Sequence, residues 1–168
     1  HRQAILILEA ARLRFGGDAR IVVQLARAYM TAGKLLTAAR LFRQASFARP
    51  RFAFDAAELF RRAARPRAAL YLNARVRDQK RKARQRLGLL IELERFEEAA
   101  ALAPRLARLG LLDDDAVRYA VAYALYQGGS HEAAERHLGR IRGARLFRKA
   151  TELRQVMARC RQAGWSCL

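Results

Sequence analysis

The sequence contains little of what interrupts a helix. Only three prolines and ten glycines occur in 168 residues, and both residue types disfavour helix interiors. No apolar run approaches the roughly 18 residues that a membrane-spanning helix needs. The 52% hydrophobic and 29% charged residues are typical of a folded domain rather than a disordered chain. The composition therefore predicts helix nearly throughout.

Acidic residues are also scarce. The chain has 15 Asp and Glu against 34 Lys and Arg, which gives a formal net charge of +19. Almost all of the basic residues are arginines, whose planar guanidinium groups suit carboxylates and phosphates. The charge favours acidic proteins, anionic lipid, acidic polysaccharide or nucleic acid as partners. A GC-rich genome with solvated arginines explains the same composition, so charge alone names no partner.

There are only two cysteines, Cys160 and Cys167, and both fall near the C-terminus. In an oxidising compartment they would form a disulfide that holds the tail against the last helix. A reduced structural pair is the alternative. Half of a metal site is disfavoured, because no nearby His or Cys pair completes a tetrahedral set. We favour the disulfide, which predicts an extracytoplasmic location.

The sequence shows no constellation that points to catalysis. The histidines His1, His131 and His137 are scattered, and the acidic run 113–115 is explained by helix capping. No Ser/His/Asp set, paired carboxylates or phosphate-binding glycine loop occurs. We therefore predict a non-enzymatic protein with neither metal nor cofactor. The chain begins inside a helical pattern without a signal-peptide pattern, which predicts a mature or trimmed fragment of a longer protein.

The strongest pattern is the stretch DARIVVQLARAYMTAGKLLTAARLFRQASFARP, residues 18–50. Small and large residues mark one face of each of two helices, on either side of Gly33: Leu25, Ala26 and Tyr29, then Ala38, Phe42 and Ala45. The small residues would lie where the helices cross, and the aromatic residues would fill the space beside them. A hairpin of this kind cannot bury its apolar face alone, so it predicts stacked neighbours.

This spacing resembles the tetratricopeptide repeat. The resemblance implies an all-α, right-handed α-solenoid of antiparallel helical hairpins with a C-terminal capping helix. We expect a single domain over residues 1–168. It would comprise the second helix of a truncated repeat, four hairpins, and a capping helix with its cysteine-linked tail: 1–17, 18–50, 51–79, 80–111, 112–142 and 143–168. Individual helices are predicted over 52–63 and 67–78, and Pro104 predicts a kink or break.

Three strings narrow the resemblance: ALYLNARVRDQKRKARQRLG, LLDDDAVRYAVAYALY and LFRKATELR, followed by the closing Cys-x6-Cys pair. They are similar to periplasmic repeat proteins of Gram-negative bacteria that accompany energy-transducing systems of the TonB, ExbB and ExbD type. That resemblance implies a periplasmic location and an accessory role in TonB-dependent transport.

In tetratricopeptide proteins the first helices of successive hairpins line a groove that binds partner segments. The positions that project from those helices here are Arg20, Gln24, Arg27, Arg61, Arg62, Arg84, Tyr119, Tyr123 and Tyr126. A wider set adds Arg51, Arg81 and Gln85. Tyr and Arg concentrate at binding hot spots. The alternatives are a solvated arginine surface, and tyrosines that pack between hairpins with their hydroxyls at the edge.

Two functional hypotheses follow. The first is a non-catalytic protein-interaction scaffold, in which a basic, tyrosine-bearing groove holds an acidic or extended segment of an envelope complex. Repeats that clamp a C-terminal carboxylate have basic and amide residues where this chain has Val23 and Asp55, so that function is not assigned. The second hypothesis is binding of a polyanion, either nucleic acid or acidic polysaccharide, along the arginine-rich surface.

Overall fold

The structure, a computed structural model, describes residues 2–162. Every regular element in that range is helical, which confirms the predicted all-α class. The chain forms two compact units, residues 1–85 (unit 1) and residues 86–168 (unit 2). Each unit is described by itself below.

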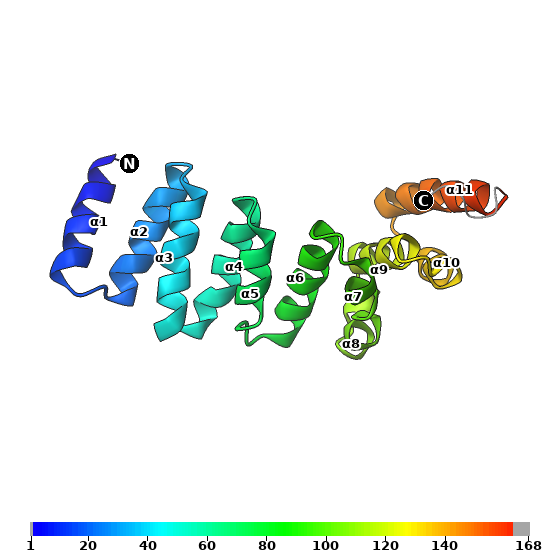
Figure 1. Ribbon diagram of the computed structural model, residues 1–168, viewed down its shortest axis with the longest axis horizontal. Helices are drawn as coiled ribbons and strands as arrows, with labels where there is room; N and C mark the ends of the chain where they lie inside the picture. The colour runs from blue at the N-terminus through cyan, green and yellow to red at the C-terminus, as the bar shows by residue number, and fades with distance from the viewer. Residues whose placement is uncertain (1, 163–168) are drawn as a thin grey trace. The chain divides into compact units, whose positions relative to one another are not determined.

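Unit 1 is a series of helices in which each element packs against the next along the chain. Figure 1 shows α1 to α5 side by side in that order. The elements are α1 (Arg2–Arg14), α2 (Ala19–Thr31), α3 (Leu35–Ala48), the 3-10 turn η1 (Pro50–Phe52), α4 (Ala53–Arg62) and α5 (Pro66–Asn73). Helix α6 (Gln79–Glu92) begins in unit 1 and ends in unit 2.

The core of unit 1 is built from alanines with large side chains between them. Six alanines of α2, α3 and α4 are completely buried: Ala26, Ala38, Ala39, Ala53, Ala56 and Ala57. Because alanine has only a methyl side chain, the helix backbones can approach closely at these points. Phe42 and Phe60 fill the space beside the crossings and are each 5% exposed. The inner face predicted for residues 18–50 is therefore confirmed, with Tyr29 half-buried at its edge.

Four hairpin turns share one backbone hydrogen-bond pattern. At the first turn, Gly33 N donates to Met30 O at 3.0 Å and Lys34 N donates to Tyr29 O at 2.9 Å. This pair of bonds is a Schellman motif, which needs a residue of positive φ just after the helix. The same pair recurs after α4, α6 and α9. The positive-φ residues are Gly33 (φ 73°), Ala64 (φ 55°), Glu94 (φ 57°) and Gly129 (φ 77°).

A buried amide pair fixes the start of α6 in unit 1. Asn73 is fully buried, and its Nδ2 donates to Lys82 O at 3.0 Å and to Gln85 Oε1 at 3.1 Å. Gln85 Nε2 donates in turn to Phe54 O at 3.2 Å. Gln85 was expected on the groove surface, but it is 9% exposed because these bonds hold it inside. Helix α5 ends at Asn73 rather than at the predicted residue 78.

Unit 2 contains the rest of α6 and six further helical elements. These are α7 (Phe96–Ala100), α8 (Ala103–Arg108), the 3-10 turn η2 (Leu111–Asp113), α9 (Asp115–Gln127), α10 (His131–Leu138) and α11 (Ala144–Gln162). Helices α7 and α8 replace one predicted helix. Pro104 lies in the first turn of α8 and has no N–H for the carbonyl of Ala100. The predicted break at Pro104 is confirmed.

One contact of unit 2 joins residues far apart in the sequence. Asp114 caps α9 by accepting a hydrogen bond from Ala116 N at 2.8 Å, as the capping prediction expects. Asp115 instead accepts from Gly143 N at 2.7 Å and from Arg142 N at 3.2 Å. The Asp115 carboxylate therefore holds the turn that leads from α10 into α11, a role that the local pattern did not indicate.

Candidate functional site

The candidate site in unit 1 is the surface where the first helices α2 and α4 meet the start of α6. We call it the first-helix face and define it by Gln24, Arg27, Phe54, Asp55, Arg81 and Arg84. Helices α2, α4 and α6 contribute to this face. The second helices α3 and α5 come between them along the chain. The surrounding side chains of Gln24, Arg27, Arg81 and Arg84 are exposed, whereas Phe54 and Asp55 are half-buried.

Asp55 is the chemically unusual residue of this face. Burial raises the pKa of its carboxyl above the usual value, and the nearby guanidinium groups of Arg81 and Arg27 oppose the rise. Within the described residues, neither a hydrogen bond nor an ion pair reaches its side chain. A half-buried carboxylate without a donor is unfavourable for folding. Asp55 is therefore available to accept a hydrogen bond from a bound partner.

Arg81 lies beside Asp55 but stacks on a neighbouring ring. Its guanidinium carbon is 3.8 Å from the centroid of the Phe54 ring, which is a close cation–π contact. The Arg81 backbone N–H donates to Asp78 Oδ1 at 3.0 Å, at the start of α6. The guanidinium edges point to no carboxylate among the described residues. Arg81 thus keeps its hydrogen-bond donors for an anionic ligand.

The α2 residues of the predicted groove lie on one exposed face of that helix. Arg20, Gln24 and Arg27 follow one another at helical spacing and are all exposed. Arg20 pairs with the N-cap residue Asp18, with Nη2 at 2.9 Å from Oδ2. Its hydrogen bonds lower the pKa of Asp18 to about 2. Arg20 therefore serves the helix start, and Gln24 and Arg27 are the freer residues of the set.

The other arginines predicted for the groove of unit 1 occupy two places. Arg61 and Arg62 end α4, and Arg61 binds Glu58 with Nη2 at 2.7 Å from Oε1. Arg62 is exposed. Arg84 lies one turn after Arg81 on α6 and is also exposed. Arg61 and Arg62 lie at the end of α4 opposite to Asp55, so they are not part of the first-helix face.

The three predicted tyrosines lie on α9 in unit 2 and differ in burial. Tyr126 is 6% exposed and lies in a core cluster with Leu138 and Met157. It packs against the His131 ring with centroids 5.6 Å apart. This corrects its expected place on a groove surface, since α10 and α11 cover it.

Tyr119 and Tyr123 are half-buried. Burial raises the pKa of Tyr119, with smaller contributions from Tyr123 and Glu152. The Tyr123 hydroxyl accepts from Gln127 Nε2 at 3.1 Å, and its ring meets Phe96 edge-on at 6.0 Å. Both rings therefore pack between helices and expose only part of their surface, the arrangement that the alternative interpretation expected.

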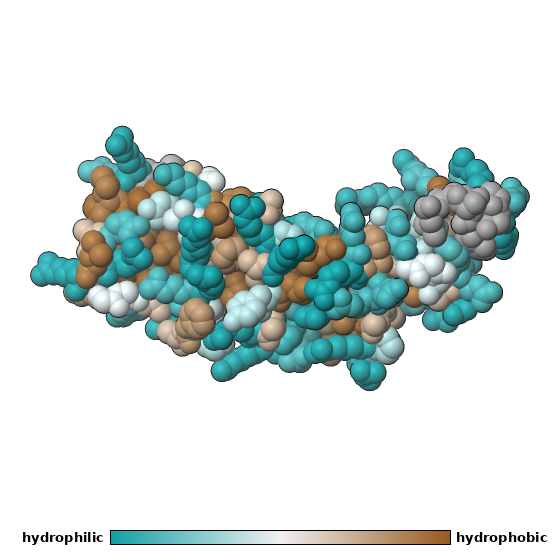
Figure 2. Space-filling view, viewed as in Figure 1, coloured by the Kyte–Doolittle hydropathy of each residue, from teal (hydrophilic) through white to brown (hydrophobic). Residues whose placement is uncertain are grey.

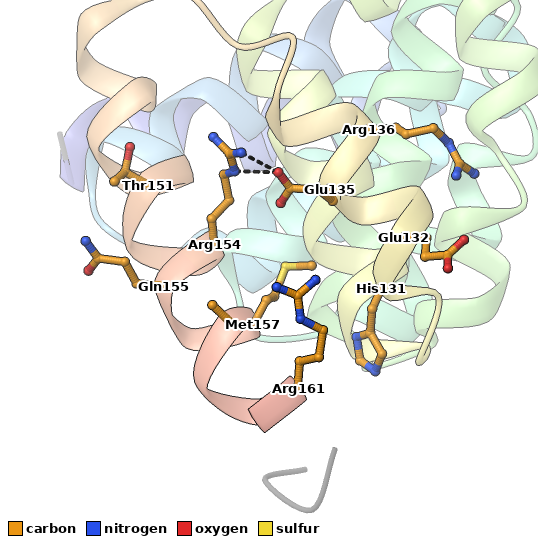
Figure 3. A pocket seen from close by; sticks show the side chains of 10 residues that line it. His131, Glu132, Glu135, Arg136, Thr151, Arg154, Gln155, Met157 and Arg161 are labelled. Atoms are coloured by element: carbon orange, nitrogen blue, oxygen red, sulfur yellow. Dashed lines mark hydrogen bonds and ion pairs between the residues drawn. The ribbon is translucent and has the colours of Figure 1, made fainter. Parts of the chain in front are cut away.

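Unit 2 also has an open groove of about 820 Å³ between α10 and α11. Figure 3 shows its two walls, with Met157 pointing between the helices and an ion pair across them. That pair joins Arg154 Nη2 to Glu135 Oε1 at 2.5 Å. Both partners are almost half exposed, so their pairing adds little to stability. Among the described residues that line it, neither a nucleophile paired with a base nor a pair of facing carboxylates occurs.

Neither a metal-binding cluster nor a membrane-spanning helix occurs in the part of the chain that the structure describes. Among residues 2–162, no three His, Cys, Asp or Glu side chains are grouped closely enough to hold a metal ion. Over the same range, no helix combines the length and apolar character needed to cross a bilayer. Cys160 is buried in the last turns of α11. Cys167 lies outside the described residues, so the predicted Cys160–Cys167 disulfide stays a prediction.

Comparison with known proteins decides the type of fold. Neither protein-family models nor curated proteins give a match. Among solved structures, the chain is similar to MamA MSR-1 at 25% identity, with a TM-score of 0.65 over 92% of this chain and 87% of that one. MamA AMB-1 gives 24% identity and a TM-score of 0.67, over 92% and 82% of the two chains. MamA is a tetratricopeptide-repeat protein. The fold is of the tetratricopeptide type.

The sequence pattern predicted the basic residues of the first-helix face, Arg27, Arg81 and Arg84. It did not predict that Phe54 and Asp55 lie at the centre of that face. Asp55 was noted only as a departure from carboxylate-clamping repeats, and Phe54 was not singled out. One signal was available: Asp55 precedes the buried pair Ala56 and Ala57 directly. A carboxylate beside core positions, in a chain with few acids, indicates a special environment.

Proposed function

We propose that this protein is a non-catalytic protein-interaction scaffold that binds an extended partner segment on the first-helix face of unit 1. The tetratricopeptide-type fold supports a scaffold in general terms. The observation that carries the proposal is Asp55, a half-buried carboxylate without a donor, beside exposed Arg27 and Arg81. An unfavourable buried charge that folding does not require is typical of a functional site.

The charges of this face define the partner. Arg27, Arg81 and Arg84 favour carboxylates on the partner segment. Asp55 requires one hydrogen-bond donor between them, such as a lysine, an arginine or an amide. We therefore expect an acidic segment with a single donor residue near its middle.

Peptide selection followed by calorimetry tests this proposal. Libraries of extended peptides displayed against the full chain should yield acidic sequences with a central donor. Arg27→Ala with Arg81→Ala should weaken the selected peptides at least about tenfold, since each lost charged hydrogen bond is worth roughly 1.5–3 kcal/mol. The matched control is Arg145→Ala with Arg148→Ala, two exposed arginines of α11. Equal weakening by the control pair would remove the first-helix face from the proposal.

Asp55→Asn separates binding from stability. Because burial raises the pKa of Asp55, the ionised carboxylate destabilises the folded state above that pKa, and the neutral amide removes this effect. We expect the variant to resist urea better than the parent at neutral pH while binding the selected peptides more weakly. The control is Asp113→Asn, an exposed carboxylate in unit 2, which should change neither. A less stable Asp55→Asn protein would contradict the assignment.

We further propose that the protein acts in the periplasm as an accessory of a TonB-type envelope complex, as one domain over residues 1–168. These finer statements rest on the sequence resemblance and on the cysteine pair alone. Alkylation of the native protein without reductant, followed by mass spectrometry, tests the compartment. We expect both Cys160 and Cys167 to resist alkylation until reductant is added. Two alkylated thiols in the native protein would count against the periplasm.

A further inference from the structure

The second helices of unit 1 carry a different surface, which contains a groove of about 470 Å³ between α1 and α3. Its walls include Glu9 and Arg12 from α1, and Arg40, Arg43 and Phe47 from α3. The α3 residues Arg40, Arg43 and Phe47 share one helix face because they are three and seven positions apart. This α1–α3 groove does not overlap the first-helix face.

The charges along the α1–α3 groove are unbalanced. Glu9 is its one acidic residue and is already engaged: Oε2 accepts from Arg12 Nε at 3.1 Å, and Oε1 accepts from the Tyr29 hydroxyl at 2.9 Å. Arg40 and Arg43 are exposed, and no ion pair reaches either of them within the described residues. The groove therefore offers two unneutralised guanidinium groups on one helix face.

An exposed aromatic ring lies at the end of this groove. Phe47 is 60% exposed, so most of its ring is open to solvent. The Arg75 guanidinium carbon lies 4.7 Å from the centroid of its ring. Figure 2 shows that hydrophobic surface remains visible between hydrophilic side chains on unit 1. The Arg75 guanidinium thus covers one face of the ring, and the exposed remainder of the ring lies beside the two unpaired arginines.

Arginine–phenylalanine stacking is common throughout unit 1. Four such pairs occur among its described residues: Arg14–Phe15, Arg51–Phe52, Arg75–Phe47 and Arg81–Phe54. Two of these pairs, Arg75–Phe47 and Arg81–Phe54, join residues from different elements. Arg75 and Phe47 are 28 positions apart in the sequence, and α5 with the segment after it brings them together.

We propose that the α1–α3 groove binds single-stranded nucleic acid. Arg40 and Arg43 contact consecutive phosphates, and a base stacks on the exposed part of the Phe47 ring, which Arg75 supports from one face. Bases stack on aromatic rings and on guanidinium planes, and this contact tolerates any base because each has a flat face. An acidic peptide would satisfy the arginines as well, but its carboxylates gain nothing from an exposed ring. The observations thus favour a polyanion that carries planar groups.

Fluorescence anisotropy with the full chain and a labelled oligouridine of about 10 nucleotides tests the proposal. We expect micromolar binding at low salt, with a linear fall of log K against log salt. Phe47→Ala should weaken binding roughly 5- to 150-fold, the measured range for one stacked base. Arg40→Ala with Arg43→Ala should lower the salt slope by about 1.4, since each single-strand phosphate contact contributes about 0.7.

Matched controls lie on α11 in unit 2. Phe147 is 56% exposed, so Phe147→Ala removes an equally exposed ring, and Arg145→Ala with Arg148→Ala removes an equal charge. Both controls should bind the oligouridine as the parent does. Because Phe47 and the arginines are exposed, none of these variants should lower the melting temperature appreciably.

Four outcomes would overturn the proposal. The first is the absence of oligouridine binding at low salt. The second is equal weakening by the α11 controls. The third is polyphosphate binding as tight as oligouridine binding with no effect of Phe47→Ala, which indicates a general polyanion surface. The fourth is competition by polyglutamate that depends on Phe47, which indicates an acidic protein partner instead.

Discussion

At the scale of single residues, Asp115 and Gly143 form the contact that ties the start of α9 to the start of α11. The Asp115 carboxylate lies so close to Gly143 that a Cβ atom built there would be 2.9 Å from Oδ2. A side chain at this position therefore displaces the carboxylate from the two backbone N–H groups that it binds. The close approach of the carboxylate favours glycine at this position.

Gly143→Ala should accordingly lower the free energy of unfolding by about 1 kcal/mol, the typical net value of a hydrogen bond. Urea titration followed by circular dichroism measures the change. Gly88→Ala is the matched control, because Gly88 lies within α6 and an added Cβ meets no atom within 4 Å. That substitution should stabilise the protein by about 0.5–1 kcal/mol. A Gly143→Ala protein as stable as the parent would show that the carboxylate moves freely.

His137 makes the stability of unit 2 depend on pH. Burial lowers the pKa of its imidazole below 6.5, and Arg118, Arg140 and Arg136 lower it further. The unfolded chain therefore binds a proton at a higher pH than the folded chain does. It follows that stability is lost as the pH falls from about 6.5 through the folded pKa.

His137→Gln should make the free energy of unfolding less dependent on pH in that range. We expect the parent to lose more stability than the variant between about pH 7.5 and pH 5.5. Urea titrations of both proteins at each pH measure this difference. At the higher pH the imidazole is neutral, so the difference in stability between the two proteins there reflects altered packing alone and can be subtracted. Parallel pH dependences would mean that His137 keeps its ordinary pKa.

At the scale of elements, the four Schellman turns explain why the helical hairpins could be predicted from the sequence. Gly33 and Gly129 mark two turns openly, and both have positive φ. The turns at Ala64 and Glu94 adopt the same backbone without glycine. An L-residue in that region costs roughly 1–2 kcal/mol, which packing of the flanking helices must offset.

Ala64→Gly should therefore stabilise unit 1, by roughly 0.5–1 kcal/mol after the greater chain entropy of glycine is subtracted. The neighbour Ala63 has φ of −85° and provides the control. Ala63→Gly gains no relief from strain and should destabilise the protein. Thermal unfolding of the two variants distinguishes these cases, and a lower melting temperature for Ala64→Gly would refute the strain argument.

Helix positions could be predicted from local signals, whereas several site residues could not. The apolar spacing and Gly33 predicted the positions of α2 and α3 closely. Pro104 predicted the break between α7 and α8. The burial of Tyr126 and Gln85 depends on helices that pack over them from elsewhere in the chain. Spacing within one helix cannot show which neighbour covers a face, so exposure of these two residues was expected where burial occurs.

At the scale of the whole molecule, the charge of +19 opposes folding by mutual repulsion. Salt screens this repulsion, since the Debye length falls from about 30 Å at 0.01 M to about 10 Å at 0.1 M. We expect the melting temperature to rise over that range and then to level off. Replacing Arg145 and Arg148 with Gln should reduce the rise. A melting temperature independent of salt would mean that local pairing already compensates the charge.

The repeated turns also have a use in protein engineering. Because α2, α4, α6 and α9 each end on the same pair of backbone hydrogen bonds, at Gly33, Ala64, Glu94 and Gly129, we expect that the chain can be joined to another repeat at these turns without losing a cap. A hairpin that begins after one of these turns is therefore a unit that can be replaced by another hairpin. Chimeras joined at residues 33 and 129 would show whether binding moves with the hairpin or belongs to its neighbours.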